Sequence, residues 1–473
     1  MLIIRINCFT YIRLSNILWQ KKIGSQRLYM PSLSKFFHVD SLTIIMWSLV
    51  SIIGLCVASF SSRYLKGDRK QKSFYFNMLG LSLALFIMTS ADNIWFLFTA
   101  WGSANLFLTR LMLHKHEWQA AVGSAQLAFK NFALGLLFIG IAFLSLYHAS
   151  GQTSIQKILN SNINQFWLAF SGSFILLGAM TQSALWPFHR WLISSLNSPT
   201  PVSAIMHSGL INGGGFLLAR FAPIFLQQAH FLNIIFIIGI VTAVLGTLWK
   251  LMQNDIKRML ACSTMGQMGF MLAQCGLGLF PAAIAHLCWH GFFKAYLFLS
   301  SSMAAQERRL DFEYPPQIKH FLLALIYGGI GAAVFAIVSN KSILIADTNL
   351  FLTVLAMLAS TQLSLSIIRN GNTINLLLTL IGVIIINAIY GFNVYFIELA
   401  LAPLNIDKPQ AFNLIHGGGL IILIATWLAM LFGRHTLEKA NYPQWALKLY
   451  VRMLNYSQPH PKTVTAYRKQ YKF

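Results

Sequence analysis

The sequence predicts an all-α protein that crosses a membrane many times. Only 10% of its 473 residues are charged and 56% are hydrophobic, which is far less charge than a soluble domain needs. Apolar runs near the length of about 20 residues that crosses a bilayer recur throughout the chain. Basic residues gather at the ends of these runs and in the loops, so the formal net charge of +23 indicates membrane topology and not a nucleic-acid partner.

The apolar runs predict about 13 transmembrane helices. In chain order they are 41–60, 74–91, 93–113, 128–147, 165–185, 202–222, 231–252, 257–279, 281–303, 320–338, 343–368, 374–403 and 412–433. They form one transmembrane domain, 41–433, which is preceded by a basic N-terminal segment, 1–40, and followed by a basic tail, 434–473.

Basic residues also predict the orientation. The loop 61–73 is rich in lysine and arginine, and the predicted spans put it on the same side as Lys257, the Arg308–Arg309 pair and the tail. We therefore expect this side to be the cytoplasm. Residues 1–40 do not fit, because they are basic and yet fall outside; an extra crossing near 2–19, or a translation start at Met30, would each resolve this.

Three prolines predict a broken helix near 185–222. Pro187, Pro199 and Pro201 cannot continue a helical hydrogen-bond ladder, so we expect a short helix, a break at "SPTP" and a second helix. Irregular backbone at membrane depth is tolerated where protein or a water-filled cavity lines it, and transporters use such breaks to build ion sites. The alternative is a tight turn at the membrane surface, with glycines 213–215 serving only close helix packing.

Three ionisable side chains interrupt the apolar run "AHLCWHGFFKAYLFLS" at 285–300. His286, His290 and Lys294 are spaced four apart and share one face of a helix. A lysine at the centre of a span costs roughly 2.5–3.5 kcal/mol on insertion scales, so it should face the bundle interior. Lysine and histidine can both exchange protons there, which favours ion or proton conduction. The alternatives are snorkelling, which the position of Lys294 near the middle of 281–303 disfavours, and a hydrogen-bonded structural role for one histidine.

No sequence signal points to a cofactor or metal in this chain. The cysteines at 8, 56, 262, 275 and 288 mostly lie inside spans without a CxxC pair, as buried small apolar residues do. Neither a Walker A motif, a GxGxxG after a strand nor a haem-attachment motif is present. We expect a transport subunit and not an enzyme.

Several segments resemble the core of the proton-conducting antiporter-like subunits of respiratory complex I, multisubunit Na+/H+ antiporters and related hydrogenases. They are "VDSLTIIMWSLVSIIG", "ADNIWFLFTAW", "SPTPVSAIMHSGLINGGGFLLAR", "DIKRMLACSTMGQMGFM" and "HLCWHGFFKAYLFLS", and they cover roughly residues 38–305. The resemblance implies the antiporter-like fold. It also implies that His207, His286, His290 and Lys294 lie on a proton path. Asp255 and Lys257 match the family's "DIKK" turn between two spans.

Two positions depart from the family pattern. Gln182 stands where the family usually has a lysine, and Gly102 stands where it usually has a glutamate. In the family these residues form a pair in the membrane. Losing one partner would leave a buried charge at a cost of about 3–5 kcal/mol, whereas losing both can be nearly neutral. The absence of both charged residues is therefore consistent with a stable membrane domain. It also argues against an ordinary pump module of complex I.

The chain is most similar to the DabB branch of this family, the membrane subunits of DAB-type inorganic carbon transporters. The resemblance implies a large zinc-binding partner of the DabA type that is similar to β-carbonic anhydrases. Flow of H+ or Na+ through this chain would power CO2 hydration by that partner, in the inner (plasma) membrane of a bacterium. The alternatives are a proton-pumping subunit of a complex I-like quinone oxidoreductase or hydrogenase, and a subunit of a multisubunit cation/proton antiporter.

The tail, residues 434–473, alternates basic residues with tyrosine and tryptophan, and prolines interrupt any long helix. Such a segment can dock a soluble partner, or lie at lipid headgroups with aromatic anchors. We favour docking, because part of the tail resembles the DabB branch specifically.

Overall fold

The computed structural model describes residues 36–301, 316–342, 345–368, 373–439 and 443–464. Among these residues the chain forms α-helices and short 3-10 helices, and its only extended pairings are isolated bridges. The predicted all-α class is confirmed. Most of the N-terminal segment 1–40, and both Arg308 and Arg309, lie outside the described residues.

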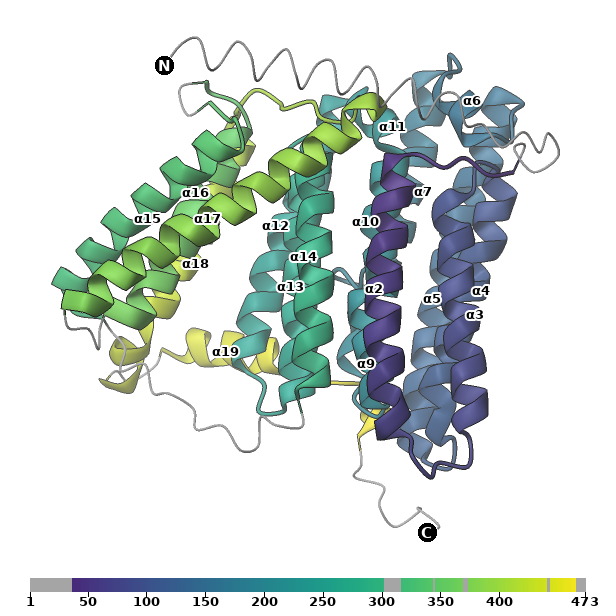
Figure 1. The fold of residues 1–473 in the computed structure, drawn as a ribbon, viewed down its shortest axis with the longest axis horizontal. Helices are drawn as coiled ribbons and strands as arrows, with labels where there is room; N and C mark the ends of the chain where they lie inside the picture. The colour runs from purple at the N-terminus through teal and green to yellow at the C-terminus, as the bar shows by residue number, and fades with distance from the viewer. Residues whose placement is uncertain (1–35, 302–315, 343–344, 369–372, 440–442, 465–473) are drawn as a thin grey trace.

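The N-terminal part of the described chain is a bundle of long helices that run side by side (Figure 1). In chain order its elements are α2 (Ser41–Tyr64), α3 (Gln71–Ser90), α4 (Ile94–Met112), η1 (Leu113–Lys115), α5 (Gln119–Ser150), α6 (Ile155–Leu159) and α7 (Gln165–Gln182). Asp40, Asn93 and Asn164 precede α2, α4 and α7, and each side chain accepts a hydrogen bond from a backbone N–H of the first turn. Such caps explain where these helices begin.

The centre of the molecule holds short helices and three long ones. They are α8 (Arg190–Ile193), α9 (Thr200–Ser208), η2 (Leu210–Asn212), α10 (Gly213–Arg220), α11 (Ala222–Leu226), α12 (Ala229–Leu251), α13 (Ile256–Gly276) and α14 (Phe280–Leu299). Together α9, η2 and α10 make one interrupted span whose apolar window is wholly buried. Because it is buried, the irregular turn in its middle is shielded from lipid.

Glycines bring α12 and α13 into close contact. A Cβ at Gly239 would overlap the backbone of Ala273, and one at Gly246 would overlap the backbone of Gly266. Small residues at a helix–helix interface let the two backbones approach closely. This contact fixes α13, which carries several residues of the candidate site, against the rest of the bundle.

The C-terminal part forms a second group of helices, tilted relative to the first (Figure 1). Its elements are α15 (Ile318–Val338), α16 (Asn349–Ile368), α17 (Thr373–Leu401), η4 (Ala402–Leu404) and α18 (Leu414–Lys439). After α18 the chain crosses beneath α12 and α13 as α19 (Gln444–Tyr456) and ends its described part in η5 (Pro461–Thr463).

The described part of the tail is anchored on the chain itself. The His460 backbone N–H donates to Ser194 Oγ at 2.9 Å, and Asn197 Nδ2 donates to Thr463 O at 2.9 Å. In contrast, α19 leaves Trp445 70% exposed. The tail therefore combines an anchored end with an exposed helix.

Nine helices among the described residues are long and apolar enough to cross a membrane, so the chain is a multi-pass membrane protein. The expected number of about 13 is not confirmed by these criteria. Four further long helices, α4, α7, α13 and α14, stand in the same bundle but are not among the nine. Polar side chains inside α7, α13 and α14, including Gln182 and Lys294, make them less apolar.

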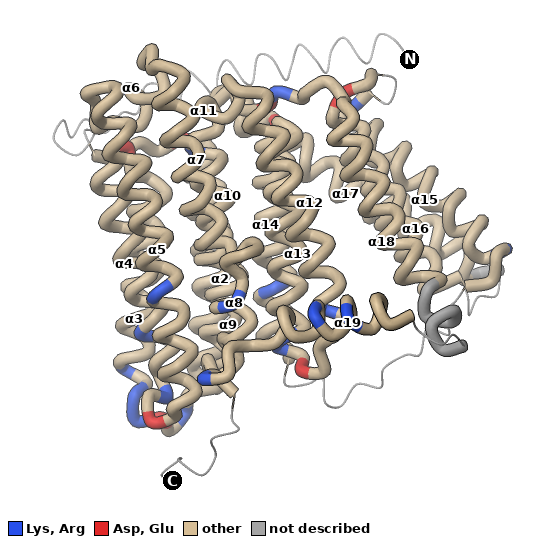
Figure 2. The backbone as a smooth tube through the Cα atoms, turned by 180° about the vertical axis from the view of Figure 1, so that it is seen from behind, with Lys and Arg blue, Asp and Glu red and all other residues tan. Residues whose placement is uncertain are grey.

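Lysine and arginine gather at one end of the bundle (Figure 2). This end, here called the basic face, carries the loop between α2 and α3, the turn between α12 and α13, and α19. The structure thus places loop 61–73, Lys257 and the described tail on the same side of the molecule, as the predicted topology requires.

Candidate ion pathway at the broken helix

Helix α14 carries the predicted stripe of His286, His290 and Lys294. Lys294 is fully buried and His290 is nearly so, whereas His286 is partly exposed. Each step of four residues turns a helix slightly more than once, so the stripe drifts from the interior at Lys294 toward the outer surface at His286. It is a buried stripe with one partly exposed end.

Lys294 lies nearer the C-terminal end of its helix than the sequence indicated, because α14 ends at Leu299. Its side chain nevertheless does not reach for the surface. Instead, Lys294 Nζ donates to the backbone carbonyl of Leu260 on α13 at 3.1 Å. A fully buried ammonium with a partner on a neighbouring helix is a different arrangement from snorkelling.

A threonine connects this lysine to the broken helix. The carbonyl oxygen of Leu260 also accepts a hydrogen bond from Thr264 Oγ1 at 3.0 Å. In turn, Thr264 Oγ1 lies 3.0 Å from His207 Nδ1 on α9. Because the hydroxyl proton of Thr264 is directed at Leu260, the His207 Nδ1–H is the group that donates to Thr264. Lys294 and His207 are therefore bound to opposite ends of one short turn of α13.

Sequence analysis did not single out Thr264, although it lies inside the segment "DIKRMLACSTMGQMGFM" on which the resemblance rests. A threonine inside a helix can donate a hydrogen bond from its hydroxyl to the carbonyl four residues earlier, and here that carbonyl belongs to Leu260. This general property of threonine is the only indication that the sequence gives. Only the approach of α9 and α14 makes that hydroxyl a bridge.

The two histidines of α14 differ in their contacts. Neither ring nitrogen of His290 has a hydrogen-bond partner among the described residues, and the same is true of His286 Nε2. His286 hydrogen-bonds to the backbone of Gln267, which fits the alternative of a structural histidine. Their rings are nearly parallel, with centroids 6.3 Å apart. Buried nitrogens of this kind need partners such as bound water.

The broken helix has the expected break and a second interruption that the sequence did not indicate. The "SPTP" segment separates α8 from α9, as predicted, and Pro201 sits in the first turn of α9. A second interruption, at Gly209–Asn212, divides α9 from α10. Gly214 and Gly215 serve close packing, because a Cβ at either would overlap α7 or α13. The SPTP turn lies at the end of the bundle where Lys257 and the tail contact it, whereas the second interruption lies inside the buried span.

Asp255 and Lys257 have separate surroundings. Asp255 is exposed, and its side chain accepts a hydrogen bond from the Arg258 N–H at 3.0 Å, so it caps α13 and lies apart from the stripe. Lys257 Nζ donates to Ser198 O at 3.2 Å. Lys257 also lines a narrow cleft together with His207 and Phe298. The cleft has no room for a water molecule, so these side chains close it around the buried histidine.

Neutral hydrogen bonds occupy the position where the family usually has a buried lysine. Trp101 Nε1 donates to Gln182 Oε1 at 3.0 Å, and Gln182 Nε2 donates to Asn105 Oδ1 at 3.1 Å. Gly102, on the same helix as Trp101, has no side chain and so carries no charge that a lysine at position 182 would need to balance. The structure thus supports the view that both charges were lost together, because the glutamine is satisfied without one.

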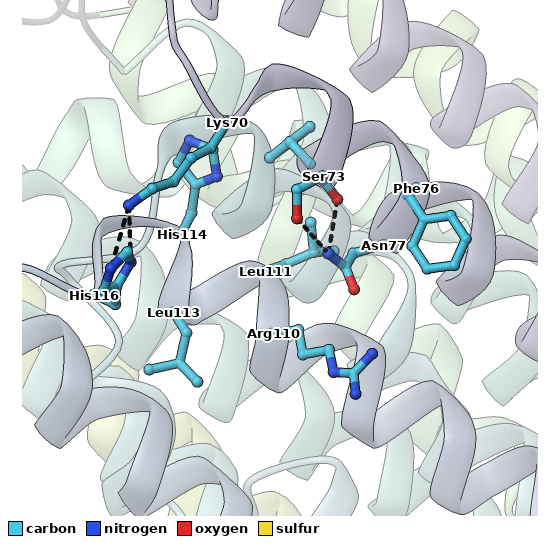
Figure 3. Close-up of a pocket in the computed structure, with 10 residues that line it drawn as sticks. Lys70, Ser73, Phe76, Asn77, Arg110, Leu111, Leu113, His114 and His116 are labelled. Carbon is cyan, nitrogen blue, oxygen red and sulfur yellow. Dashed lines mark hydrogen bonds between the residues drawn. The ribbon is translucent and has the colours of Figure 1, made fainter.

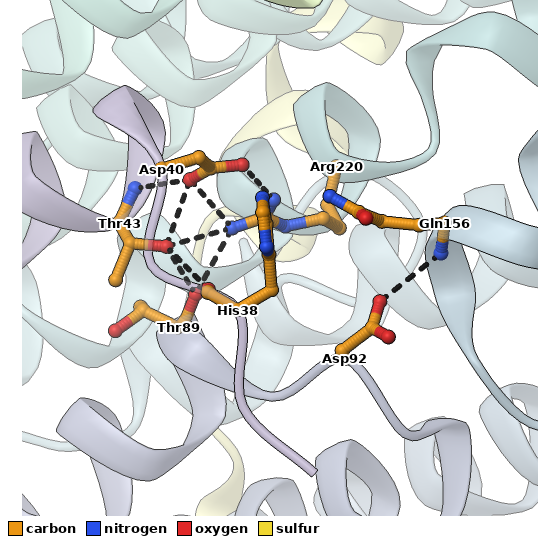
Figure 4. A network of polar contacts seen from close by, with 7 residues as sticks. All are labelled: His38, Asp40, Thr43, Thr89, Asp92, Gln156 and Arg220. Atoms are coloured by element: carbon orange, nitrogen blue, oxygen red, sulfur yellow. Dashed lines mark hydrogen bonds and ion pairs between the residues drawn. The ribbon is translucent and has the colours of Figure 1, made fainter. Parts of the chain in front are cut away.

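The other end of the broken helix is held by an ion pair (Figure 4). Arg220, the last residue of α10, pairs with Asp40, and its Nη2 lies 3.0 Å from both Thr43 Oγ1 and Thr89 O. Burial raises the pKa of Asp40, but the Arg220 guanidinium and the hydrogen bonds from Thr43 outweigh it and bring this pKa below its usual value. The arginine therefore fastens α10 to α2 and α3.

Two family models match this chain. The model described as "NADH:quinone oxidoreductase/Mrp antiporter, TM" matches residues 91–321, and the model described as "NADH-Ubiquinone oxidoreductase (complex I), chain 5 N-terminus" matches residues 32–75. All the candidate pathway residues lie inside the first of these ranges. Over these residues the chain is similar to this family of antiporter-like membrane subunits.

Within this family the chain is similar to proteins named as probable inorganic carbon transporter subunits. It is 37% identical to the DabB subunit of Bacillus subtilis over 57% of this chain and 54% of that protein. It is 35% identical to the DabB1 subunit of Halothiobacillus neapolitanus over 60% of this chain and 53% of that protein. The chain thus spans about half the length of these relatives.

More distant relatives belong to other branches. The chain is 31% identical to the chloroplastic NAD(P)H-quinone oxidoreductase subunit 5 of Gossypium barbadense over 59% of this chain and 39% of that protein. A chain of the Mrp complex from Dietzia sp. DQ12-45-1b shares the fold, with a TM-score of 0.59, 21% identity, and coverage of 89% of this chain and 53% of that one. The predicted antiporter-like fold is confirmed.

Among the described residues no group of three or more His, Cys, Asp and Glu side chains could hold a metal ion. The stripe itself offers two histidines and a lysine, and lysine is not a usual metal ligand. What the arrangement can do chemically is hold and exchange protons at buried nitrogen atoms.

Proposed function

We propose that this chain is the proton-conducting membrane subunit of an energy-coupled inorganic carbon transporter. The observation that carries the proposal is the buried connection from Lys294 through Leu260 and Thr264 to His207. The similarity to DabB subunits supports inorganic carbon as the transported substrate. With Gln182 replacing the usual lysine, Lys294 is the central protonatable site of the matched part.

The two protonatable groups of this connection, His207 and Lys294, can each take up and release a proton, while the Leu260 carbonyl between them accepts hydrogen bonds from both sides and carries no proton itself. His207 and Lys257 line one narrow cleft, and a proton reaches His207 from the basic face when the side chains that fill this cleft move apart. Protons on His207 and Lys294 would repel each other across one turn of α13, in surroundings of low dielectric constant. Arrival of one proton therefore favours release of the other, toward His290 and His286. The broken helix places irregular backbone beside His207, as transporters do at their ion sites.

The partner and the orientation are part of the same proposal. A large zinc-binding subunit of the DabA type, similar to β-carbonic anhydrases, would hydrate CO2, and proton flow through this chain would drive that reaction in one direction. The basic face would lie in the cytoplasm of a bacterium, with the chain in the inner membrane. The gathering of lysine and arginine at that face supports this orientation.

Co-expression with such a zinc-binding partner tests the proposal. The pair should restore growth at ambient CO2 to cells that lack carbonic anhydrase, and a protonophore should abolish uptake of labelled inorganic carbon. Rescue by the partner alone would show that this subunit is dispensable. Uptake that follows a sodium gradient and resists the protonophore would make Na+ the coupling ion.

The redox and antiporter alternatives predict different results. The similarity of this chain to subunit 5 of NAD(P)H-quinone oxidoreductase is the basis of the redox alternative. A subunit of a quinone oxidoreductase or hydrogenase would copurify with flavin or iron–sulfur proteins. A cation/proton antiporter subunit would change the sodium tolerance of cells without affecting their need for CO2.

A further inference from the structure

A pocket separate from the pathway opens on the basic face, between the ends of α3 and α4 (Figure 3). It has a volume of about 620 Å³ and is lined by Lys70, Arg110 and His116 on its polar side. Phe76 and Asn77 of α3 also line it. None of these residues contributes to the connection between Lys294 and His207.

Arg110 carries the unbalanced charge of this pocket. Its side chain is exposed and makes no ion pair or hydrogen bond with another described residue. The neighbouring cation is already paired, because Lys70 Nζ lies 3.0 Å from Glu117 Oε1 and 2.9 Å from His116 Nδ1. A guanidinium at the edge of such a pocket suits a phosphate group, which it can bind through two parallel hydrogen bonds.

The carboxylates near the pocket do not cancel this charge. Asp68 is 3.0 Å from His114 Nε2, and that hydrogen bond lowers the pKa of Asp68 below its usual value. The hydrogen bond from Lys70 likewise lowers the pKa of Glu117. Each carboxylate is therefore ionised and engaged with its own partner, which leaves Arg110 available.

The other side of the pocket faces the lipid. Phe76 is 66% exposed, and Leu79 and Leu106 beside it on α3 and α4 are 60% and 52% exposed. Between the charged and apolar sides, the buried Asn77 Oδ1 has no hydrogen-bond donor among the described residues. It can accept a hydrogen bond from a hydroxyl group.

We infer that this pocket binds the headgroup of an anionic glycerophospholipid such as phosphatidylglycerol. The phosphate lies against Arg110, a headgroup hydroxyl donates to Asn77 Oδ1, and an acyl chain runs along Phe76. Basic pockets between transmembrane helices on the cytoplasmic side are suited to anionic headgroups. A free phosphate would satisfy the guanidinium but would not use the apolar wall that continues from the pocket onto the lipid-facing surface.

Native mass spectrometry of the purified full chain in detergent tests this inference. The protein is titrated with phosphatidylglycerol and, separately, with phosphatidylcholine of the same acyl chains. Arg110→Gln should weaken the binding of phosphatidylglycerol about fivefold or more, as expected for one basic residue at a membrane surface. Arg110→Lys keeps the charge and should retain most of the affinity. Binding of phosphatidylcholine should be the same in all variants.

Arg69→Gln is the matched control, because Arg69 is next to the pocket residue Lys70 in the sequence and is exposed but does not line the pocket. Equal losses in Arg69→Gln and Arg110→Gln would mean that diffuse surface charge binds the lipid, and would overturn the inference. Complete displacement of phosphatidylglycerol by millimolar inorganic phosphate would identify a free-anion site instead. Thermal unfolding of each variant verifies that the fold is intact. If Arg110→Gln does not fold, Arg110→Ala is used in its place, and wild-type affinity of that variant for phosphatidylglycerol would overturn the inference.

Discussion

At the scale of single residues, the site depends on a lysine that is fully buried and yet hydrogen-bonded. Lys294 donates to a backbone carbonyl, which holds it in either protonation state without a permanent counter-ion. A carboxylate partner would fix the charge on the amine. Because no described carboxylate pairs with Lys294, its surroundings are compatible with the proposed gain and loss of a proton.

Removing the titrating amine should stop transport. Lys294→Met keeps the length and apolarity of the side chain, so the protein should insert while uptake falls by at least about 100-fold, a typical effect of losing a proton-transferring group. Lys294→Arg should also fail, because a guanidinium does not deprotonate in proteins. Uptake of labelled inorganic carbon by cells that accumulate each variant with its partner measures the effect, and His207→Ala should impair uptake less completely. Near wild-type uptake by Lys294→Met would mean that the stripe serves only packing.

Substitutions of Thr264 test the hydrogen bond between its hydroxyl group and His207. Thr264→Val preserves shape but leaves the His207 Nδ1–H without an acceptor, a loss of about 1–3 kcal/mol at a buried group. We expect uptake to fall about tenfold, which is the factor that corresponds to about 1.4 kcal/mol. Thr264→Ser retains the hydroxyl and should restore most of the activity. If valine and serine behave alike in the same uptake assay, the hydroxyl is not part of the path.

At the scale of elements, the interrupted span α9–α10 is held at both ends. Lys257 contacts Ser198, just before α9, and Arg220 fastens the end of α10 to α2 and α3. The irregular turn at Gly209–Asn212 lies between these two anchors. Local backbone movement can therefore occur in the middle of the span while its ends stay in place.

Breaking the pair between Asp40 and Arg220 should destabilise the bundle. Asp40→Asn retains a capping side chain for α2 but leaves Arg220 without a counter-ion, at a cost of about 3 kcal/mol. Asp255→Asn is the matched control, because Asp255 also caps a helix but is exposed and forms no ion pair with another described residue. Thermal unfolding in lipid nanodiscs at pH 7 should show a lower Tm for Asp40→Asn only.

The pH dependence of this difference has a definite sign. The folded-state pKa of Asp40 lies below the usual aspartate value of 3.8, so the ion pair contributes fully above that value. Its contribution is lost as the pH falls through the lower folded-state pKa. The gap in Tm between wild type and Asp40→Asn should therefore be constant near neutrality and shrink in acid below pH 3.8. A gap that grows on acidification would contradict this assignment.

At the scale of the whole molecule, the tail links the two groups of helices. It leaves α18, crosses the basic face as α19 and ends its described part against α5 and the loop near Ser194 (Figure 1). Met453 covers an apolar cluster of α8, α12 and α13, whereas Trp445 and the polar Lys448 and Arg452 remain exposed. The exposed part of α19 is the surface available to a soluble partner.

Deleting residues 440–473 should release the proposed zinc-binding partner into the soluble fraction. The variant Lys448→Glu with Arg452→Glu keeps the helix and its apolar contacts but reverses the charge of its polar side, so it should also weaken partner retention. Fractionation of membranes washed at high salt, with quantification of both subunits, measures the effect. A partner that stays on the membrane in both variants would favour the alternative in which the tail lies at lipid headgroups.

The sequence alone determined the class of this protein, because hydropathy follows directly from composition and a lipid environment leaves few alternatives to bundled helices. Its motifs also indicated the family resemblance and the two histidines and the lysine of α14. Helical periodicity placed His286, His290 and Lys294 on one face without contact information.

Only the tertiary structure decided which of these residues are connected. Thr264 bridges Lys294 and His207 because α9 and α14 both approach the same turn of α13, and such contacts between distant segments leave no local pattern. The interruption at Gly209–Asn212 and the capping role of Asp255 likewise depend on neighbouring helices. Sequence periodicity fixes the direction of a side chain on its own helix, but the partner of a buried polar atom is set by the packing of helices that are far apart in the chain.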